Sequence, residues 1–337
     1  MLIGITYDLR SAYLAMGFSE EDTAEFDRDD TIDAIEQALT NLGHQADRIG
    51  NIRQLVGRLA AGNSWDLVFN ICEGLYGTAR EGQVPAILEA YGIPCTFSDA
   101  ALMALSLHKA WTKDVLADSV PIAGHRVIYS AEEAEACSLP SPWFVKPLCE
   151  GTGKGVTPNS LVRMQADLVP ACASLLKKFK QPVLLETYLP GREFTVSILG
   201  TGDQAYVLGT TEIVLLATAE PEVYSYINKE DCENRVENRL VSATDDPVVR
   251  QAEEVAMTVW RELKCRDAGR VDLRCDSAGE PHFMEVNPLA GMHPLHSDLP
   301  MCATDVGMPY QSLIEKIVHS ASARIEKSSC RPIPKVA

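Results

Sequence analysis

The first hundred residues alternate between short apolar runs and helical patterns, and this alternation limits the possible folds more than any other feature of the sequence. Residues 2–6 are typical of a buried strand, and apolar side chains at helical spacing follow over residues 32–42. A second strand is expected over residues 65–70, a helix over 85–91 and another strand over 92–97. This rhythm predicts an α/β fold with a parallel sheet in residues 1–100.

The pattern changes after residue 100. A helical stretch over 102–117, a strand over 143–147 and a helix over 161–178 predict a second region, residues 101–185. Alternating strands, a helix over 247–263, a hairpin and a final helix over 311–325 predict a third region, residues 186–327. The chain is therefore expected to be α+β overall. Residues 328–337 contain two prolines and no apolar face, so we expect a frayed tail.

Charge and composition exclude several classes of protein. The 337 residues include 30 basic and 47 acidic side chains, for a net charge of −17. Such a surface repels phosphate backbones and anionic lipids, which argues against nucleic-acid or membrane partners. No apolar run approaches the ~20 residues needed to span a bilayer, and the N-terminal residues do not resemble a signal peptide. The ten cysteines form no CxxC pair, so we expect reduced thiols and a cytoplasmic protein.

The expected hairpin carries the most informative polar side chains. Side chains alternate faces along a strand, so Arg270 and Asp272 share one face, and Glu285 and Asn287 share a face of the returning strand. If these faces pair, Asp272, Glu285 and Asn287 converge as oxygen ligands of the kind that Mg²⁺ prefers. The alternative is an exposed hairpin face that carries ordinary charges.

A glycine-rich loop, residues 150–155, is the second candidate for chemistry. Three glycines would let backbone N–H groups approach a phosphate, with the Thr152 hydroxyl and the Lys154 charge beside them. The loop lacks the spacing of a P-loop, and a flexible surface turn is the alternative. Lys146 lies among apolar residues just before the loop, where it needs an anionic partner, either a bound phosphate or a local carboxylate.

A third segment, residues 186–193, links two apolar strands and carries a carboxylate at each end. It could hold a purine edge and ribose hydroxyls, although its composition is also that of a plain strand–turn–strand. Other active-site motifs are missing from the sequence: no GxSxG elbow, no GxGxxG after the first strand and no HExxH.

The order of these segments resembles the ATP-grasp fold and, more narrowly, the D-alanine–D-alanine ligase family. The resemblance runs from about residue 65 to residue 317 and rests on residues 144–147, the loop 150–155, residues 186–193, residues 269–272 and residues 284–292. It also includes Glu81-Gly82, residues 92–96, His108-Lys109 and residues 192–196. The resemblance implies three domains, an N-terminal parallel α/β domain followed by central and C-terminal domains that hold ATP between them.

The resemblance also implies roles for individual residues. ATP would be bound by Lys109, Lys146, Glu150, Gly151, Gly153, Lys154, Glu186, Leu189 and Glu193. Two Mg²⁺ ions, or Mn²⁺, would be held by Asp272, Glu285 and Asn287. Catalysis would use Thr152 in the closing loop, Lys229 on the γ-phosphate, and Arg270 with the backbone of Gly291 on the developing oxyanion. Ser297 would bind the carboxylate of a second amino acid.

The sequence departs from the family at the pocket for the first amino acid. The family's first strand leads into a glycine-rich turn with a glutamate that binds the substrate ammonium, whereas here an acidic stretch follows, which we expect to be solvated over residues 20–33. The family's His-Gly is Glu73-Gly74 in this chain. We therefore expect Glu73 or Asp8 to supply the anionic partner of an ammonium group.

The predicted function is that of an ATP-dependent carboxylate–amine ligase that acts through an acyl phosphate, with D-alanyl-D-alanine as the default product. One alternative keeps this mechanism with another amino acid, a D-hydroxy acid or a metabolite carboxylate. Another is a nucleotide-binding protein without catalysis. The partners expected are ATP and small amino-acid substrates, with a homodimer carried over from the family.

Overall fold

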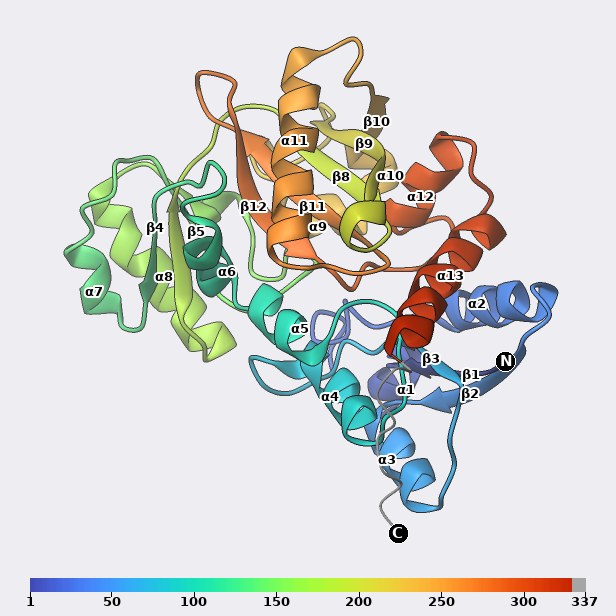
Figure 1. Ribbon diagram of the computed structural model, residues 1–337. Helices are drawn as coiled ribbons and strands as arrows, with labels where there is room; N and C mark the ends of the chain where they lie inside the picture. The colour runs from blue at the N-terminus through green and yellow to red at the C-terminus, as the bar shows by residue number, and fades with distance from the viewer. Residues whose placement is uncertain (329–337) are drawn as a thin grey trace.

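The structure, a computed structural model, describes residues 1–328 and is built around three β-sheets (Figure 1). The first sheet has the order β2-β1-β3 and is parallel, the second has the order β4-β7-β5-β6, and the third has the order β10-β9-β8-β11-β12. The strand pairs of the second and third sheets are antiparallel. The α/β N-terminal region and the α+β composition of the whole chain are thus confirmed.

The first sheet is covered on both faces. Its region comprises β1 (Leu2–Tyr7), α1 (Arg10–Ala15), α2 (Asp29–Asn41), β2 (Gln45–Gly50), α3 (Ile52–Ala60), β3 (Leu67–Ile71), η1 (Arg80–Gly82) and α4 (Gln83–Ala90). All five residues of β3 are buried, as expected for a strand with helices on both sides. Leu67 and Phe69 pack in the core that includes α2, while Val68 packs in the core that includes α3 and α4.

Several local predictions in this region were wrong. Residues 92–97 do not form a strand, because only Cys95 bridges to Val68 of β3. The sequence pattern also missed β2 and α3. The acidic stretch is not fully solvated: Thr23 and Phe26 are buried, and the Glu25 side chain is only 8% exposed. The Glu25 carboxylate can be buried because it pairs with the buried Arg80 and Lys154.

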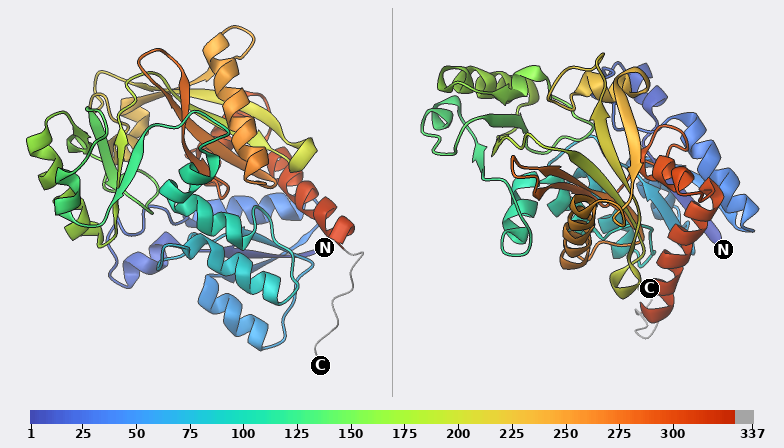
Figure 2. Two further views of the ribbon diagram at one scale, coloured as in Figure 1. Left: turned by 60° about the vertical axis from the view of Figure 1, so that its left-hand side comes forward. Right: turned by 90° about the horizontal axis from the view of Figure 1, so that it is seen from above.

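The second sheet lies at the opposite end of the molecule from the last helix (Figure 2). Its region comprises α5 (Ala100–Leu107), α6 (Lys109–Leu116), β4 (His125–Ile128), α7 (Ala131–Glu135), β5 (Trp143–Pro147), η2 (Pro158–Ser160), β6 (Leu161–Val162), α8 (Gln165–Phe179) and β7 (Val183–Thr187). Two expected helices are divided. His108 has a non-helical backbone between α5 and α6, and its side chain accepts a hydrogen bond from Trp111 N. The expected helix over 161–178 begins as the short strand β6.

The third sheet carries the hairpin. Its region comprises β8 (Glu193–Leu199), η3 (Gly202–Gln204), β9 (Tyr206–Leu215), α9 (Tyr226–Glu230), α10 (Cys232–Arg235), β10 (Val236–Val241), α11 (Pro247–Glu262), β11 (Ala268–Cys275), β12 (Pro281–Asn287), α12 (Asp298–Asp305) and α13 (Tyr310–Ser328). The apolar face of β11, with Val271 and Leu273, packs with Trp260 of α11 in one core. The opposite face of the hairpin is therefore left for polar side chains.

The last helix returns to the first sheet. Leu313 and Ile317 of α13 share one core with Ile3 of β1 and Ile32 of α2, and the red and blue elements lie together in both views of Figure 2. The regions expected over residues 1–100 and 186–327 therefore share a core, and the expected boundary at residue 185 falls within β7. The division at residues 100, 185 and 327 stays a prediction. Residues 329–337 of the expected tail lie outside the described residues. None of the helices within residues 1–328 has the length and apolar character needed to cross a membrane.

Candidate active site

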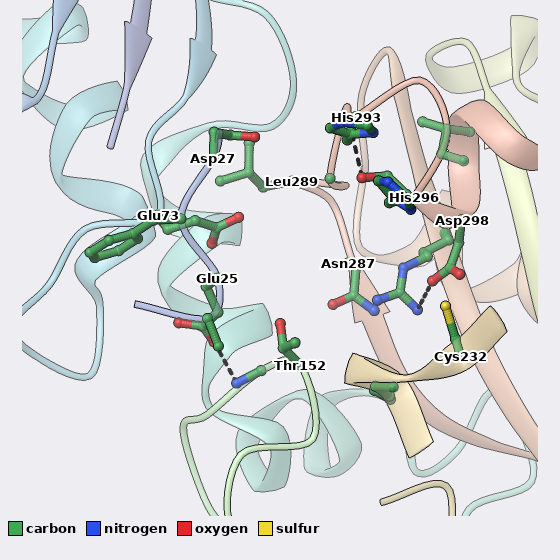
Figure 3. Close-up of a pocket in the computed structure, with 18 of the residues that line it drawn as sticks. Glu25, Asp27, Glu73, Thr152, Cys232, Asn287, Leu289, His293, His296 and Asp298 are labelled. Atoms are coloured by element: carbon green, nitrogen blue, oxygen red, sulfur yellow. Dashed lines mark hydrogen bonds and ion pairs between the residues drawn. The ribbon is translucent and has the colours of Figure 1, made fainter. Parts of the chain in front are cut away.

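A cavity of about 520 Å³ lies where the three regions meet. One wall comes from the N-terminal region, with Glu25, Asp27 and Glu73, and the other from the hairpin and the loop that follows it, with Asn287 and Asp298 (Figure 3). The sequence-predicted residues that line it are Glu73, Lys109, Gly151, Thr152, Lys229, Arg270, Glu285, Asn287, Gly291 and Ser297. Residues distant in the sequence thus share one cavity.

The hairpin register brings four predicted side chains together. Arg270 pairs with Asn287 across the two strands, and Asp272 pairs with Glu285. Arg270 Nη1 donates to Asp272 Oδ2 at 2.6 Å, and Asn287 Nδ2 donates to the same oxygen at 3.1 Å. Thr195 Oγ1 donates to the other Asp272 oxygen at 2.9 Å. The polar face of the hairpin is therefore an ordered network at the cavity wall.

The two carboxylates of this network have opposite pKa shifts. Burial raises the pKa of Asp272 to about 6, against the opposing effect of Arg270. Burial alone would also raise the pKa of Glu285, but Lys109, Lys146 and Lys229 hold it well below its usual range. Lys109 Nζ lies 3.3 Å from Glu285 Oε2. Glu285 is thus an anion held by surrounding lysines.

The hairpin donors fit a hard divalent cation only in part. In the described chain, the search for three His, Cys, Asp or Glu side chains arranged for a metal found none. Asp272 and Glu285 supply two carboxylates, and the Asn287 amide oxygen is a third donor because its nitrogen already donates to Asp272. Mg²⁺ usually takes one or two carboxylates and completes its octahedron with water and substrate phosphates. The set therefore fits Mg²⁺ together with a bound phosphate chain.

A buried charge cluster lies behind the cavity. Glu186 accepts ion pairs from Lys113 at 2.8 Å and from Lys146 at 3.0 Å, and all three side chains are at most 9% exposed. Burial alone would raise the pKa of Glu186, but the two lysines lower it to about 2. Sequence reasoning missed Lys113, although it lies one helical turn after Lys109 on α6.

The glycine-rich loop is held by the N-terminal region. Glu25 accepts hydrogen bonds from Gly151 N at 2.7 Å and from Lys154 Nζ at 3.0 Å, and it also pairs with Arg80 at 3.0 Å. Arg80 Nη1 donates to the carbonyl of Cys149 at 2.8 Å. Burial alone would raise the pKa of Glu25, but Arg80 and Lys154 lower it to about 2. Sequence reasoning missed Glu25 and Arg80, since no pattern links them to this loop.

Within the loop, Thr152 and Gly153 have φ values of 50° and 70°. A Cβ at Gly153 would lie 3.3 Å from the Lys229 side chain and 3.4 Å from Tyr226 N, so the loop packs closely on α9. Lys229 Nζ lies 4.7 Å from the Tyr224 ring centroid. Lys154 also pairs with Glu150 at 2.6 Å. The two expected closing segments therefore contact each other over the cavity.

The segment expected to bind the nucleoside does not line this cavity. Glu193 Oε2 accepts from Arg274 at 3.1 Å, and Arg274 also donates to the Tyr188 hydroxyl at 3.0 Å. Leu189 is half-buried in the turn between them. Lys146, Glu150, Gly153, Lys154 and Glu186 likewise lie outside the cavity lining.

The N-terminal wall carries carboxylates without partners. Asp27, Glu73 and Glu81 line the cavity, and within residues 1–328 their carboxylates have no hydrogen-bond or ion-pair partner. Burial and the nearby Glu81 raise the pKa of Glu73 well above its usual range, and burial raises that of Glu81 to about 7. Asp8 does not line the cavity; its carboxylate accepts from the Tyr13 hydroxyl at 2.7 Å and from Gly74 N at 2.9 Å.

The loop after the hairpin closes the opposite end. A Cβ at Gly291 would lie 2.7 Å from Ser297 Oγ, so a larger residue there would displace the Ser297 hydroxyl. Ser297 Oγ accepts from His293 N at 3.0 Å. Asp298 Oδ2 lies 3.4 Å from Arg270 Nη1, a contact that sequence reasoning missed. The predicted substrate residue Ser297 therefore lies next to Asp298, which contacts Arg270 of the hairpin.

Comparisons with known proteins agree with this architecture. A family model described as "D-ala D-ala ligase C-terminus" matches residues 123–319. A D-alanine–D-alanine ligase of Bordetella petrii is 32% identical over 298 residues, which cover 86% of each chain. The uncharacterized protein y4sG of Sinorhizobium fredii is 31% identical over 265 residues, 77% of this chain and 75% of that one.

The fold is also similar to a solved structure. The crystal structure of D-alanine–D-alanine ligase from Bacillus anthracis complexed with ATP superposes with a TM-score of 0.72 at 20% identity, covering 98% of this chain and 99% of that one. The family model covers more than half of the chain, and the Bordetella petrii relative is more than 30% identical over most of it. The chain therefore belongs to the D-alanine–D-alanine ligase family of ATP-grasp enzymes.

Proposed function

We propose that this enzyme joins a carboxylate to an amine at the expense of ATP, through an acyl phosphate. A carboxylate is a poor electrophile, and transfer of the γ-phosphoryl group to one of its oxygens makes the carbonyl carbon reactive. The amine then attacks that carbon, phosphate leaves, and the products are ADP, phosphate and an amide. The observation that carries this proposal is the cavity wall formed by Arg270, Glu285 and Asn287, with Asp272 hydrogen-bonded to Arg270 and Asn287 just behind it.

The chain's cations are suited to hold the reacting groups. Lys109 and Lys229 line the cavity with Glu285 and would bind the phosphate chain, together with Lys146, whose charge also acts on Glu285. Arg270 and the backbone N–H of Gly291 would stabilise the oxyanion of the tetrahedral intermediate. Asp272, Glu285 and Asn287 would hold Mg²⁺, and a bound ion would neutralise charge on the transferring phosphoryl group.

The closing segments would protect the acyl phosphate from water. The glycine-rich loop contacts α9 on one side and the Glu25 carboxylate on the other. An acyl phosphate that meets water is hydrolysed, so exclusion of water couples ATP use to amide formation. Thr152 lies at the cavity surface of this loop, where its hydroxyl would face the substrate.

The family relatives make D-alanyl-D-alanine the first product to test. Their name gives D-alanine as both substrates, and this proposal applies it to a chain that is 32% identical to one of them. Glu73 would bind the ammonium of the first substrate, because its carboxylate lines the cavity without a partner of its own.

A second candidate keeps the mechanism and changes the substrates. Asp27, Glu73 and Glu81 give the donor end three carboxylates that have no partner among residues 1–328, which favours a substrate that brings positive charge. Asp298 gives the other end a further carboxylate. These features motivate a broader panel of substrates.

Phosphate release from Mg-ATP tests the proposal. The panel contains D- and L-amino acids, D-lactate and simple amines, alone and in pairs, and mass spectrometry identifies amide products. We expect phosphate and an amide to form in equal amounts with at least one pair. Amide formation from two D-alanines supports the first candidate, and formation from another pair supports the second. Absence of both phosphate and amide throughout the panel contradicts the proposed function.

A further inference from the structure

Asp298 lies beside the cation that would stabilise the oxyanion. It is the first residue of α12 and follows Ser297, and its Oδ2 lies 3.4 Å from Arg270 Nη1. The same Arg270 nitrogen donates to Asp272 at 2.6 Å. The Asp298 side chain is 32% exposed and points into the cavity (Figure 3). A negative charge therefore stands next to Ser297, the residue that the family resemblance assigns to a substrate carboxylate.

The other basic side chains at this end already face carboxylates. His293 Nε2 lies 3.2 Å from an Asp30 oxygen, and His296 Nδ1 lies 3.8 Å from a Glu233 oxygen. Arg28, which also lines the cavity, pairs with Asp30 at 3.0 Å. A carboxylate placed at Ser297 would thus compete with Asp298 for Arg270. Lys229 also lines the cavity and has no ion pair among residues 1–328, but the proposed function assigns it to the phosphate chain.

An amine presents the opposite case. An ammonium that enters this end meets Asp298 before it loses its proton and attacks, so attraction would draw the group toward the reaction centre. An acceptor that has an amine but no adjacent carboxylate receives this attraction without the competing repulsion. The negative charge of Asp298 therefore favours an amine without a carboxylate over an amino acid of similar size.

We propose that Asp298 determines acceptor specificity and that the acceptor is an amine with no carboxylate beside its reacting nitrogen. This inference rests on the proposed ligase function and narrows its second substrate. It concerns the acceptor only; the donor still presents a carboxylate to ATP. Specificity is a difference between two affinities, and a repulsive element against the wrong acceptor contributes to it as much as an attractive one.

Matched pairs of acceptors test the proposal. Each pair consists of an amino acid and its amide: glycine and glycinamide, D-alanine and D-alaninamide, L-alanine and L-alaninamide. The two members differ in the carboxylate charge and little in size. The full-length enzyme is assayed with Mg-ATP and each donor of the substrate panel, and the amide product is quantified by mass spectrometry to obtain kcat/KM for the acceptor.

We expect wild-type enzyme to prefer the amide member by about tenfold or more, and Asp298→Asn to reduce that preference by about tenfold through a lower KM for the amino acid. Amino-acid amides are also weaker bases, so the informative quantity is the change in the preference between wild type and variant. Asp298→Glu keeps the charge and should keep the preference. Asp305→Asn, an equal change of charge at the exposed far end of α12, should leave it unchanged.

The outcomes distinguish failure of the inference about Asp298 and the acceptor from failure of the proposed ligase function. An unchanged preference in a folded Asp298→Asn variant overturns the role of Asp298, and a wild-type preference for the amino acid overturns the acceptor class. Both leave the ligase function standing, because amide still forms. Absence of amide and phosphate with all donors and acceptors overturns the ligase function and this inference together. Thermal unfolding of each variant shows whether it has folded.

Discussion

Glu25 accepts a hydrogen bond from the backbone N–H of Gly151 at 2.7 Å, across 126 residues of sequence. The contact ties the acidic stretch of the N-terminal region to the glycine-rich loop. Arg80 and Lys154 complete the cluster, and their side chains and that of Glu25 are no more than 8% exposed. The N-terminal region therefore helps to hold the loop over the cavity.

Replacement of Glu25 by alanine should loosen that loop. The change leaves Arg80 and Lys154 without this buried partner, and loss of one member of a buried pair costs about 3–5 kcal/mol. We expect more phosphate than amide in the products, because water would reach the acyl phosphate. The measurement is the ratio of phosphate to amide, which the proposed function predicts to be one in the wild-type enzyme.

Glu21→Ala is the matched control, since Glu21 belongs to the same acidic stretch but pairs with Lys178 at the surface. Its ratio should stay at one, and its stability should change by about 0–1 kcal/mol. A ratio of one in a folded Glu25→Ala variant would show that the cluster does not control access of water.

Replacement of Asp272 by asparagine should remove catalysis and keep the fold. The substitution preserves the shape of the side chain but removes the charge that pairs with Arg270. We expect phosphate release to fall by about 10²–10³. Asp276→Asn serves as a control, because Asp276 caps the turn of the same hairpin and faces solvent. Equal activity of the two variants would contradict a role for Asp272 at the reaction centre.

Replacement of Glu73 by glutamine should weaken binding of the first substrate. The carboxylate has no partner in the described chain, so an ammonium would be its natural ligand. We expect KM for the donor to rise about tenfold or more while kcat changes little. Glu135→Gln, on the exposed helix α7, should leave both constants unchanged. A donor KM equal to that of wild type removes Glu73 from this role.

The raised pKa of the Glu81 carboxyl predicts that the stability of the protein depends on pH. Burial raises its pKa from 4.5 to about 7, so the folded state binds the proton more tightly than the unfolded state does. Stability is therefore lost as pH rises from about 4.5 to about 7. Glu81→Gln removes this loss and should stabilise the nucleotide-free protein at pH 8 by on the order of 2 kcal/mol more than at pH 5. Thermal unfolding of the wild type and the variant at pH 5 and pH 8 measures this difference in stability. An equal difference between the two proteins at both pH values would contradict the prediction.

The parts of the site that the sequence predicted are those encoded by local periodicity. Alternation along a strand places Arg270 and Asp272 on one face, and the short turn of the hairpin brings Glu285 and Asn287 opposite them. The same argument located Lys146 in a buried strand, although its partner Glu186 could only be guessed as some anion.

The parts that were missed depend on contacts between distant segments. Glu25 follows an irregular stretch, and nothing in its neighbourhood specifies that it meets Gly151. Helix α3 is short, and its few apolar side chains become informative only when Leu55 and Leu59 are seen packing beneath the first sheet. The shared core of α13 and α2 likewise requires the fold, because the two helices lie at opposite ends of the chain.

Transfer of oxygen from the donor carboxylate to phosphate tests the acyl-phosphate mechanism most directly. A donor labelled with ¹⁸O in its carboxylate is incubated with Mg-ATP and an acceptor, and the released phosphate is analysed by mass spectrometry. The account predicts one ¹⁸O atom in each phosphate for every amide formed. Amide formation with unlabelled phosphate would contradict it.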